Sequence, residues 1–302
     1  MSLRSALLNA RRLASLPLRR HQLRGLGAQG LAPLHCVFYH RVADTHPNDW
    51  TIGCAPFERH VRYMRSHFDM IDLSELQRRV NQLDSRRPAV AITFDDGYAD
   101  NCRFALPLLM RLGVPCTYFV TVDSLLSGRP FPHDVQAGQP LDPHTPDEIR
   151  ALAAGGIEIG LHTRSHLDLA GVTDPAILRH EIIDAADALA DIVGRRIRYF
   201  AFPFGMPPQI TAQAVDAVRQ AGMDGFCSAF GAYNLPGRDA FHIRRFHGDP
   251  EFSRLLNWLQ FDARKLRIEP SVAGSSAAAG DNGTEEGQAS EAPHPTAVTN
   301  AV

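Results

Sequence analysis

The chain has a single lysine, an odd number of cysteines and no long apolar run. Lys265 is the only lysine in 302 residues, so arginine supplies nearly all of the positive charge, and the formal net charge is −2. This balance gives no reason to expect nucleic acid as a partner. The 5 cysteines contain no C-x-x-C pair, which argues against a disulfide framework and fits a reducing compartment. No apolar run approaches the length of a transmembrane helix.

Acidic residues are missing from the first 43 positions, whereas arginine is frequent there. We treat residues 1–33 as a basic N-terminal arm. Its leucines and arginines can form an amphipathic helix that lies on an anionic membrane or on an acidic partner. A frayed, solvated arm and an organelle transit peptide remain alternatives. Arginines interrupt every apolar core that a secretory signal would need, so we expect a cytoplasmic protein with peripheral membrane contact through this arm.

Strand and helix patterns alternate at least five times along the rest of the chain. This alternation predicts a parallel sheet, either open or closed into a barrel. We expect one α/β domain over residues 34–268 and a disordered tail over residues 269–302, where large apolar residues are almost absent. The predicted strands cover residues 34–39, 89–94, 115–122, 157–161 and 199–202, with weaker ones at 226–230 and 241–246. The predicted helices cover residues 56–68, 102–112, 145–154, 175–193 and 210–220, with another beginning at a capping box of Ser74 and Gln77.

Two carboxylates end the apolar run AVAITF at residues 89–94. Burying Asp95 and Asp96 at the tip of a strand is costly unless a metal or a catalytic role compensates for it. Neighbouring strand residues point to opposite faces, so the pair shares a site only if the chain bends, and Gly97 permits the bend. Asp-Asp-Gly is also ordinary turn chemistry, which leaves a purely structural alternative.

A pair of histidines follows the predicted strand at residues 157–161. His162 and His166 converge only if a short turn joins them, and with one aspartate they form an N₂O ligand set that leaves positions open. The carboxyl ends of parallel strands meet at one edge of the sheet, so these histidines and the Asp pair are expected there together. Two carboxylates also occur in glycosidases, but adjacent carboxylates beside a histidine pair fit a metal hydrolase better.

Three motifs occur in order: T-F-D-D-G at 93–97, H-T-R-S-H at 162–166 and F-A-F-P-F-G at 200–205. Together they resemble the NodB-type polysaccharide deacetylases, and the resemblance covers most of residues 34–250. It implies a distorted parallel (β/α) barrel. It also implies that Asp96, His162 and His166 bind a divalent metal (zinc, with cobalt or nickel as alternatives), and that Asp95 is the general base. The backbone N–H of Phe204 would hold the oxyanion, aimed by the turn that Pro203 fixes.

The sequence departs from the family pattern in two places. Ala201 stands where the family usually carries an arginine that orients the base, and Arg244 or Arg245 is the substitute we consider. The late strand that usually supplies an acid histidine is not clearly present. We therefore expect His40 to be the general acid, because some family members that act on poly-N-acetylglucosamine carry the corresponding strand first. His247, or a merely structural role for His40, is the alternative.

The resemblance implies hydrolysis of N-acetyl groups on a sugar of a polysaccharide or glycan precursor. Two alternatives stay open. The first is hydrolysis of another non-peptide C–N bond on the same fold, and the second is a non-catalytic glycan-binding module, suggested by the missing arginine at Ala201.

Overall fold

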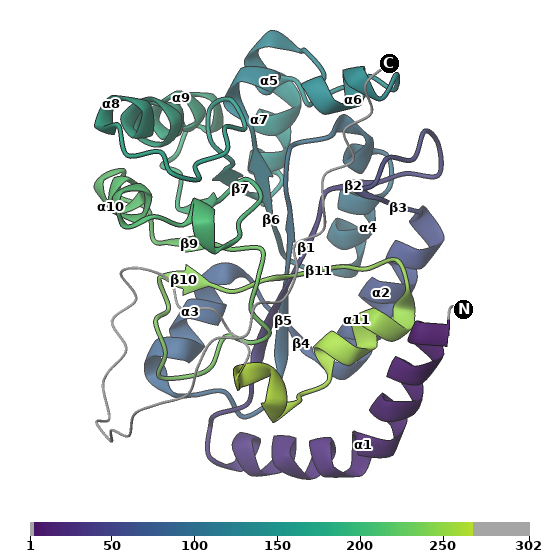
Figure 1. Cartoon of the computed structure of the whole chain (residues 1–302). Helices are drawn as coiled ribbons and strands as arrows, with labels where there is room; N and C mark the ends of the chain where they lie inside the picture. The colour runs from purple at the N-terminus through teal and green to yellow at the C-terminus, as the bar shows by residue number, and fades with distance from the viewer. Residues whose placement is uncertain (1–2, 268–302) are drawn as a thin grey trace.

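The apolar runs of the sequence form a curved sheet in which every pairing is parallel (Figure 1). The computed structural model describes residues 3–267. The 9-stranded sheet has the order β10-β9-β8-β7-β6-β5-β1-β11, and β4 pairs with β5 beside this path. Its strands are β1 (Leu34–Tyr39), β4 (Asp69–Met70), β5 (Ala89–Phe94), β6 (Cys116–Val120), β7 (Glu158–Leu161), β8 (Tyr199–Ala201), β9 (Gly225–Cys227), β10 (His242–Ile243) and β11 (Phe246–His247). The short strands β2 (Arg41–Val42) and β3 (Thr51–Ile52) form a separate pair.

The two edge strands of the sheet follow each other directly in the chain. Only Arg244 and Arg245 separate β10 from β11, so the two edges must lie close together. The run at residues 241–246, predicted as one strand, is therefore divided between two strands on opposite edges. The result is a parallel sheet curled into an incomplete barrel, which confirms the predicted distorted (β/α) barrel.

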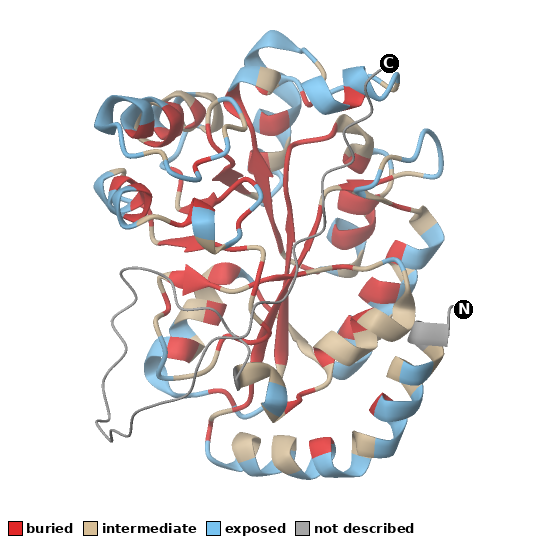
Figure 2. Ribbon diagram, in the orientation of Figure 1, coloured by how far each residue is buried: buried red, intermediate tan, exposed pale blue. Residues whose placement is uncertain are grey.

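Helices connect the strands and cover the outside of the sheet (Figure 2). All six residues of β1 and of β5 are buried, because one face of each strand meets the helices and the other faces the barrel interior. The main helices are α2 (Cys54–His67), α3 (Leu73–Gln82), α4 (Ala105–Leu112), α5 (Val122–Ser127), α6 (Pro132–Gln136), α7 (Pro146–Ala154), α8 (Pro175–Leu178), α9 (Asp184–Val193), α10 (Ala212–Gln220) and α11 (Phe252–Leu259). Short 3₁₀ turns occur at η1 (Ala99–Cys102), η3 (Pro207–Gln209) and η4 (Ala263–Arg267).

Local capping signals mark several helix boundaries and correct one prediction. The capping box of Thr145 and Glu148 opens α7 as expected. The predicted cap at Ser74 is wrong, because the Asp72 side chain accepts from the Glu75 N–H and caps α3 two residues earlier. The predicted helix at residues 175–193 is interrupted by a π-helical segment, η2 (Arg179–Ile183), between α8 and α9.

Residues 3–28 form one long helix, α1 (Leu3–Ala28), that packs along α11. The buried Arg19 side chain forms an ion pair with Asp262 at 3.0 Å, and Arg12 donates to the Gln260 side chain at 3.1 Å. The described part of the arm is therefore attached to the domain. Within residues 3–267, no helix combines the length and the apolar character needed to cross a bilayer. The predicted disordered tail lies outside the described residues.

Candidate active site

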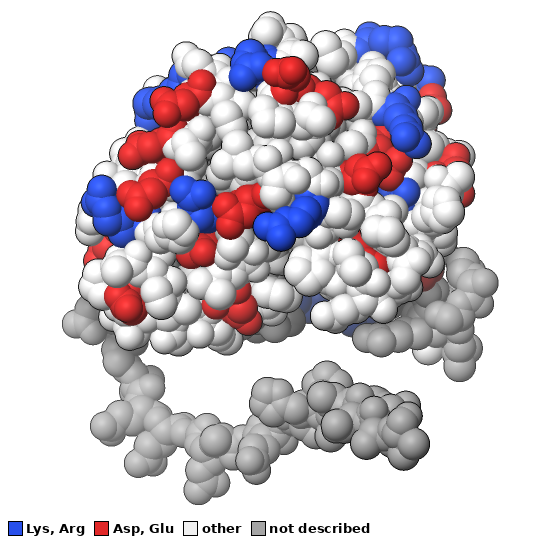
Figure 3. Space-filling view, turned by 90° about the horizontal axis from the view of Figure 1, so that it is seen from above, with Lys and Arg blue, Asp and Glu red and all other residues white. Residues whose placement is uncertain are grey.

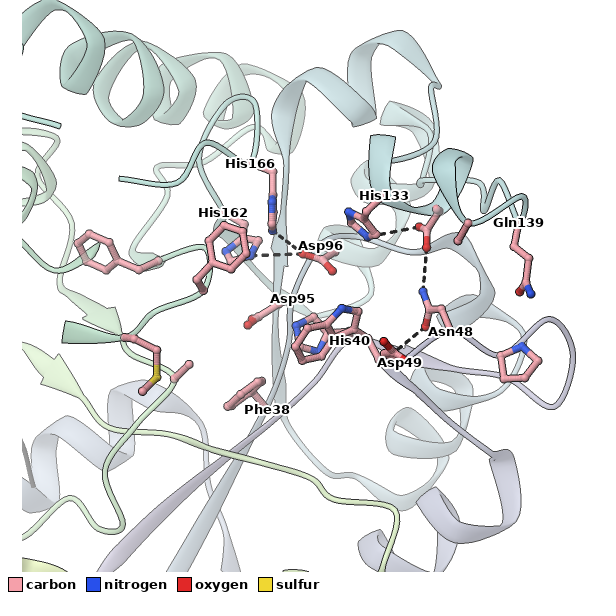
Figure 4. Close-up of a pocket in the computed structure, with 18 residues that line it drawn as sticks. Phe38, His40, Asn48, Asp49, Asp95, Asp96, His133, Gln139, His162 and His166 are labelled. Carbon is pink, nitrogen blue, oxygen red and sulfur yellow. Dashed lines mark hydrogen bonds and ion pairs between the residues drawn. The ribbon is translucent and has the colours of Figure 1, made fainter. Parts of the chain in front are cut away.

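The site residues predicted from the sequence, except Pro203, line one cavity of about 810 Å³ at the carboxyl ends of the strands (Figure 4). The in-register pairing of β1 with β5 carries His40 and Asp95 to the same level of the sheet. The residues that line the cavity include Phe38, His40, Asn48, Asp49, Trp50, Asp95, Asp96, His133, Asp134, His162, His166, Phe202, Phe204 and Met206.

Asp96, His162 and His166 converge on one point. The Asp96 Oδ1 lies 3.3 Å from the Nε2 of His162 and 3.3 Å from the Nε2 of His166. The backbone bend that lets Asp95 and Asp96 face one cavity begins at Asp96 itself, where φ is 74°, and continues through Gly97 with φ of 96°. The bend was expected only at Gly97. Figure 4 shows both imidazoles directed at the Asp96 carboxylate.

The donor set of these three residues fits a divalent cation. Within residues 3–267 the buried Asp96 Oδ1 has no hydrogen-bond partner of good geometry. The Nδ1–H of His162 donates to the Ala201 carbonyl at 2.8 Å, which leaves Nε2 with its lone pair toward Asp96. Separations of 3.3 Å are close to those between ligands that share one small cation at about 2.0–2.1 Å. Carboxylate and imidazole donors together suit zinc and similar divalent ions.

The Asp96 carboxylate and the imidazoles next to it attract one another electrostatically. Burial would raise the pKa of the Asp96 carboxyl, but the neighbouring imidazoles of His40, His162 and His166 outweigh burial and hold that pKa well below its usual value. Burial would lower the pKa of His166, but Asp96 outweighs it and raises that pKa. The site therefore favours a cationic partner for the Asp96 carboxylate.

Asp95 is held by Arg245, one of the two arginines considered from the sequence. The Arg245 guanidinium donates to both carboxylate oxygens, with Nη1–Oδ1 at 2.7 Å and Nη2–Oδ2 at 2.9 Å. Burial would raise the pKa of Asp95, but the charge of Arg245 outweighs it and lowers that pKa. Arg245 also donates to the Ser228 carbonyl and to the Thr93 hydroxyl inside the barrel. The Arg244 side chain donates instead to the His242 carbonyl.

His40 lines the cavity, whereas His247 does not. Their rings lie 6.0 Å apart, and the His40 ring contacts the Trp50 ring at 4.8 Å. Within the described residues the His40 Nδ1 is buried and has no hydrogen-bond partner. Burial lowers the pKa of His40, although Asp96 and Asp95 oppose this shift, and burial lowers the pKa of His247 to about 4. The cavity therefore brings His40, not His247, to the other site residues.

Phe204 follows β8 in a tight left-handed turn. Its φ is 59°, and the next N–H, of Gly205, donates back to the Pro203 carbonyl at 2.6 Å. Pro203 is buried, and the Phe204 ring is 57% exposed at the cavity wall, 5.6 Å from the His166 ring. Within residues 3–267 the Phe204 N–H donates to no backbone carbonyl.

A polar group that sequence reasoning missed lies on the other side of the cavity. The buried Asp134 accepts from the Tyr98 hydroxyl at 2.9 Å and from the Asn48 amide at 2.9 Å. Arg41 holds the loop that carries Asn48 and Trp50, since its guanidinium donates to the carbonyls of Thr45 and His46. Only the contacts across distant segments identify this group, and no local motif marks it.

In the described part of the chain, none of the residues that line the cavity is lysine or arginine. Figure 3 shows acidic and basic side chains interspersed over the face seen from above. That face shows no continuous patch of one sign.

Fold and site together define a (β/α) half-barrel protein with an Asp-His-His centre at the strand ends. Residues 82–226 match the model of a family described as polysaccharide deacetylase. The match includes the Asp pair, both histidines and the turn at Phe204. Over these residues the chain is similar to the polysaccharide deacetylase family.

One curated protein is similar to this chain at low sequence identity. A Bacillus subtilis (strain 168) protein, YxkH, named as a candidate polysaccharide deacetylase, is 25% identical over 189 residues. The match covers 61% of this chain and 61% of that relative.

Solved structures show the same fold. IcaB from Ammonifex degensii has a TM-score of 0.65 at 22% identity, covering 76% of this chain and 97% of that one. The Streptococcus pyogenes deacetylase PplD in complex with acetate has a TM-score of 0.62 at 16% identity, covering 77% of this chain and 100% of that one.

Proposed function

We propose that this chain is a metal-dependent hydrolase that removes N-acetyl groups from an amino sugar in a polysaccharide or glycan precursor. One observation carries the proposal: Asp96, His162 and His166 converge beside a second, arginine-held aspartate inside a region that matches a deacetylase family. A buried carboxylate oxygen without a hydrogen-bond partner is the feature that a bound cation explains best.

Asp96, His162 and His166 would hold a divalent cation, with zinc, cobalt or nickel as candidates. Bound there, the cation would polarise the acetyl carbonyl and lower the pKa of water toward neutrality. Asp95 is the base that takes the proton from the attacking water. Arg245 keeps both oxygens of Asp95 in fixed positions, so the base is oriented and stays ionised.

The backbone N–H of Phe204 would stabilise the negative charge that develops on the acetyl oxygen during attack. It lies at the cavity wall in a turn that Pro203 and Gly205 close. His40 would donate a proton to the amine nitrogen as the C–N bond breaks. Burial lowers the pKa of His40, so its imidazole is mostly neutral near pH 7 and must take up a proton before it donates one.

The observed contacts favour this function over the glycan-binding alternative. A glycan-binding module was considered because Ala201 replaces the family arginine, but Arg245 makes the corresponding bidentate contact with Asp95. A binder has no need of an oriented base. Hydrolysis of another non-peptide C–N bond would use the same residues, so only the substrate separates it from deacetylation.

Acetate release from N-acetylglucosamine oligomers, with and without chelator, tests the proposal. We expect release that chelator abolishes and that added zinc or cobalt restores. Asp95→Asn should keep the metal content and lose turnover, since the amide still accepts from Arg245 but does not act as a base. Turnover of other amides or cyclic ureides, with none of the oligomers, would favour the C–N alternative. Asp95→Asn that stays fully active would contradict the assigned base.

We further propose that the outer face of α1 lies on an anionic membrane surface. Leu7, Leu13 and Leu18 are 63%, 50% and 61% exposed on this helix, which contains arginines and no acidic residue. Exposed leucines among arginines suit an interfacial helix. Sedimentation with vesicles should show binding that requires anionic lipid and that serine at the three leucine positions weakens. Equal binding by wild type and variant would contradict it. The cytoplasmic location that we expect from the sequence stays a prediction.

A further inference from the structure

The turn that joins His162 to His166 is held from outside the cavity by a buried glutamate. Glu181 lies in η2 and is only 6% exposed. Its Oε2 accepts from the N–H groups of Arg164 and Ser165 at 3.1 and 3.0 Å, and its Oε1 accepts from the Ser165 hydroxyl at 2.8 Å. The Glu181 carbonyl also accepts from the Arg164 N–H at 3.0 Å. One residue thus fixes the two central positions of the turn.

This turn needs such support because its backbone is strained. Thr163 and His166 both have φ of 62°, a left-handed conformation that non-glycine residues adopt at a cost. Strain of this kind persists only where the surroundings determine the conformation. On the opposite side, the N–H groups of Val122 and Asp123 donate to the carbonyls of Thr163 and Arg164. Hydrogen bonds to the start of α5 and to Glu181 therefore hold the turn in place.

The helix that carries Glu181 changes its winding at this point. The η2 segment is a π-helix between two α-helical stretches. π-helical segments are rare and are found frequently at functional sites. Glu181 itself does not line the cavity. Any influence on the chemistry must pass through the turn to His166.

We propose that Glu181 is the positioning residue that sets the cation affinity of the Asp96–His162–His166 centre. It does so by holding the turn in the conformation that brings the His166 Nε2 to Asp96. The inference rests on the proposed function, since it assumes that the three residues bind a cation. Neither the sequence motifs nor the family match points to a residue 15 positions beyond His166.

Two substitutions separate geometry from charge. Glutamine is isosteric with glutamate: its oxygen can accept from both backbone N–H groups, while its NH₂ donates to the Ser165 oxygen, whose hydroxyl rotates freely. Glu181→Gln should therefore keep the turn and lose only the charge assistance. Glu181→Ala removes all three side-chain bonds and leaves the Ser165 N–H without its acceptor in the protein.

The control is Ile182→Ala, one residue along the same segment. Ile182 is fully buried in the hydrophobic core and contributes packing. Its truncation lowers the stability of the fold without removing a bond to the turn. Any loss of metal affinity that merely reflects a weaker fold will appear in this variant as well.

Titration of the metal-free proteins with Co²⁺, followed by its visible absorption, is the experiment. Circular dichroism shows that each variant is folded. We expect Glu181→Ala to raise the cobalt Kd by about 10–100-fold, the range for outer-shell partners of metal ligands, and to change the absorption bands. Glu181→Gln and Ile182→Ala should stay close to wild type in both readouts.

The outcomes distinguish the inference from the function beneath it. If the wild-type protein binds no cobalt, or if the His162→Ala variant binds cobalt as tightly as the wild type, then both the metal site and the role of Glu181 are wrong. If the wild-type protein binds cobalt through His162, but Glu181→Ala and Ile182→Ala have the same cobalt Kd, then only the role of Glu181 is wrong. If Glu181→Ala does not fold, Glu181→Met replaces it, because methionine keeps most of the side-chain volume and removes both carboxylate acceptors: cobalt affinity equal to wild type in Glu181→Met rejects the inference.

Discussion

Replacing Arg245 by methionine should destabilise the fold strongly and in a pH-dependent way. Both members of the Arg245–Asp95 pair are buried, with side chains 0% and 4% exposed. Removing one partner of a buried ion pair costs about 3–5 kcal/mol, because the remaining charge has no compensation. The Ser228 carbonyl also loses its donor, which adds about 1–3 kcal/mol. The total is a large part of the 5–15 kcal/mol that stabilises a typical domain, by a rough general estimate.

The sign of the pH dependence follows from the shifts in pKa. In the wild type the folded-state pKa of Asp95 is lowered, so its contribution to stability is present above the unfolded pKa of about 3.9 and is lost as pH falls through the folded value. Without Arg245, burial raises the folded-state pKa of Asp95. The variant then gains stability as pH falls through that raised value. The difference between the two proteins should be largest near neutral pH and should shrink toward acid.

Urea unfolding of the metal-free proteins between pH 5 and pH 8 measures this difference. Arg254→Met is the matched control, since Arg254 pairs with Asp249 at 2.8 Å on the surface, where a pair contributes about 0–1 kcal/mol. Arg245→Met combined with Asp95→Asn should recover part of the loss, because the unpaired buried charge is gone. If Arg245→Met costs no more than Arg254→Met, or if its cost is independent of pH, the assignment of Arg245 as the compensating charge is wrong.

Two further predictions concern the chemistry and the cation. His40→Ala should reduce deacetylation of an N-acetyl sugar by about 10²–10⁴-fold, but it should spare hydrolysis of 4-nitrophenyl acetate, whose leaving group needs no proton. His247→Ala should leave both rates near wild type, and the reverse pattern would move the acid role to His247. Cation binding should raise the free energy of unfolding by about 2.7 kcal/mol at a metal concentration of 100 times Kd. Thermal unfolding with zinc and with chelator measures this gain, which should vanish in His166→Ala; a gain that survives there would place the cation elsewhere.

The part of the site that local motifs encode could be predicted from the sequence. Asp95 and Asp96 follow a strand of clear apolar pattern, and His162 and His166 follow another, so strand parallelism alone brings the four together. The parallel sheet followed from the alternation of strands and helices, and the family resemblance implied its closure into a distorted barrel. Roles in catalysis and metal binding stay predictions at every one of these positions.

Contacts made by tertiary structure could not be predicted with the same certainty. Arg245 reaches Asp95 only because β10 and β11 lie on opposite edges of a curled sheet, whereas the sequence pattern at 241–246 predicted a single strand. Glu181 reaches the histidine turn from the middle of a helix, where its position has no local signature. The same limit applies to Asp134, whose partners are distant in sequence.

Phe204 offers a test of whether backbone strain at the cavity serves the chemistry. Its φ of 59° costs about 1–2 kcal/mol for a non-glycine residue, whereas glycine in its place costs about 0.5–1 kcal/mol in chain entropy. The side chain is 57% exposed, so little burial is lost. Phe204→Gly should therefore leave stability unchanged or raise it by up to about 1 kcal/mol.

The same substitution should lower kcat, because a glycine turn holds the N–H at this position less firmly. Phe204→Ala retains both the N–H and the left-handed strain, so it separates the effect of the ring from that of the backbone. We expect Phe204→Ala to keep kcat closer to wild type than Phe204→Gly does, with any loss of the ring appearing in KM. Equal kcat values for the two variants would show that the rigidity of this turn does not contribute to turnover, and that its strain follows from the geometry of the chain after β8 alone.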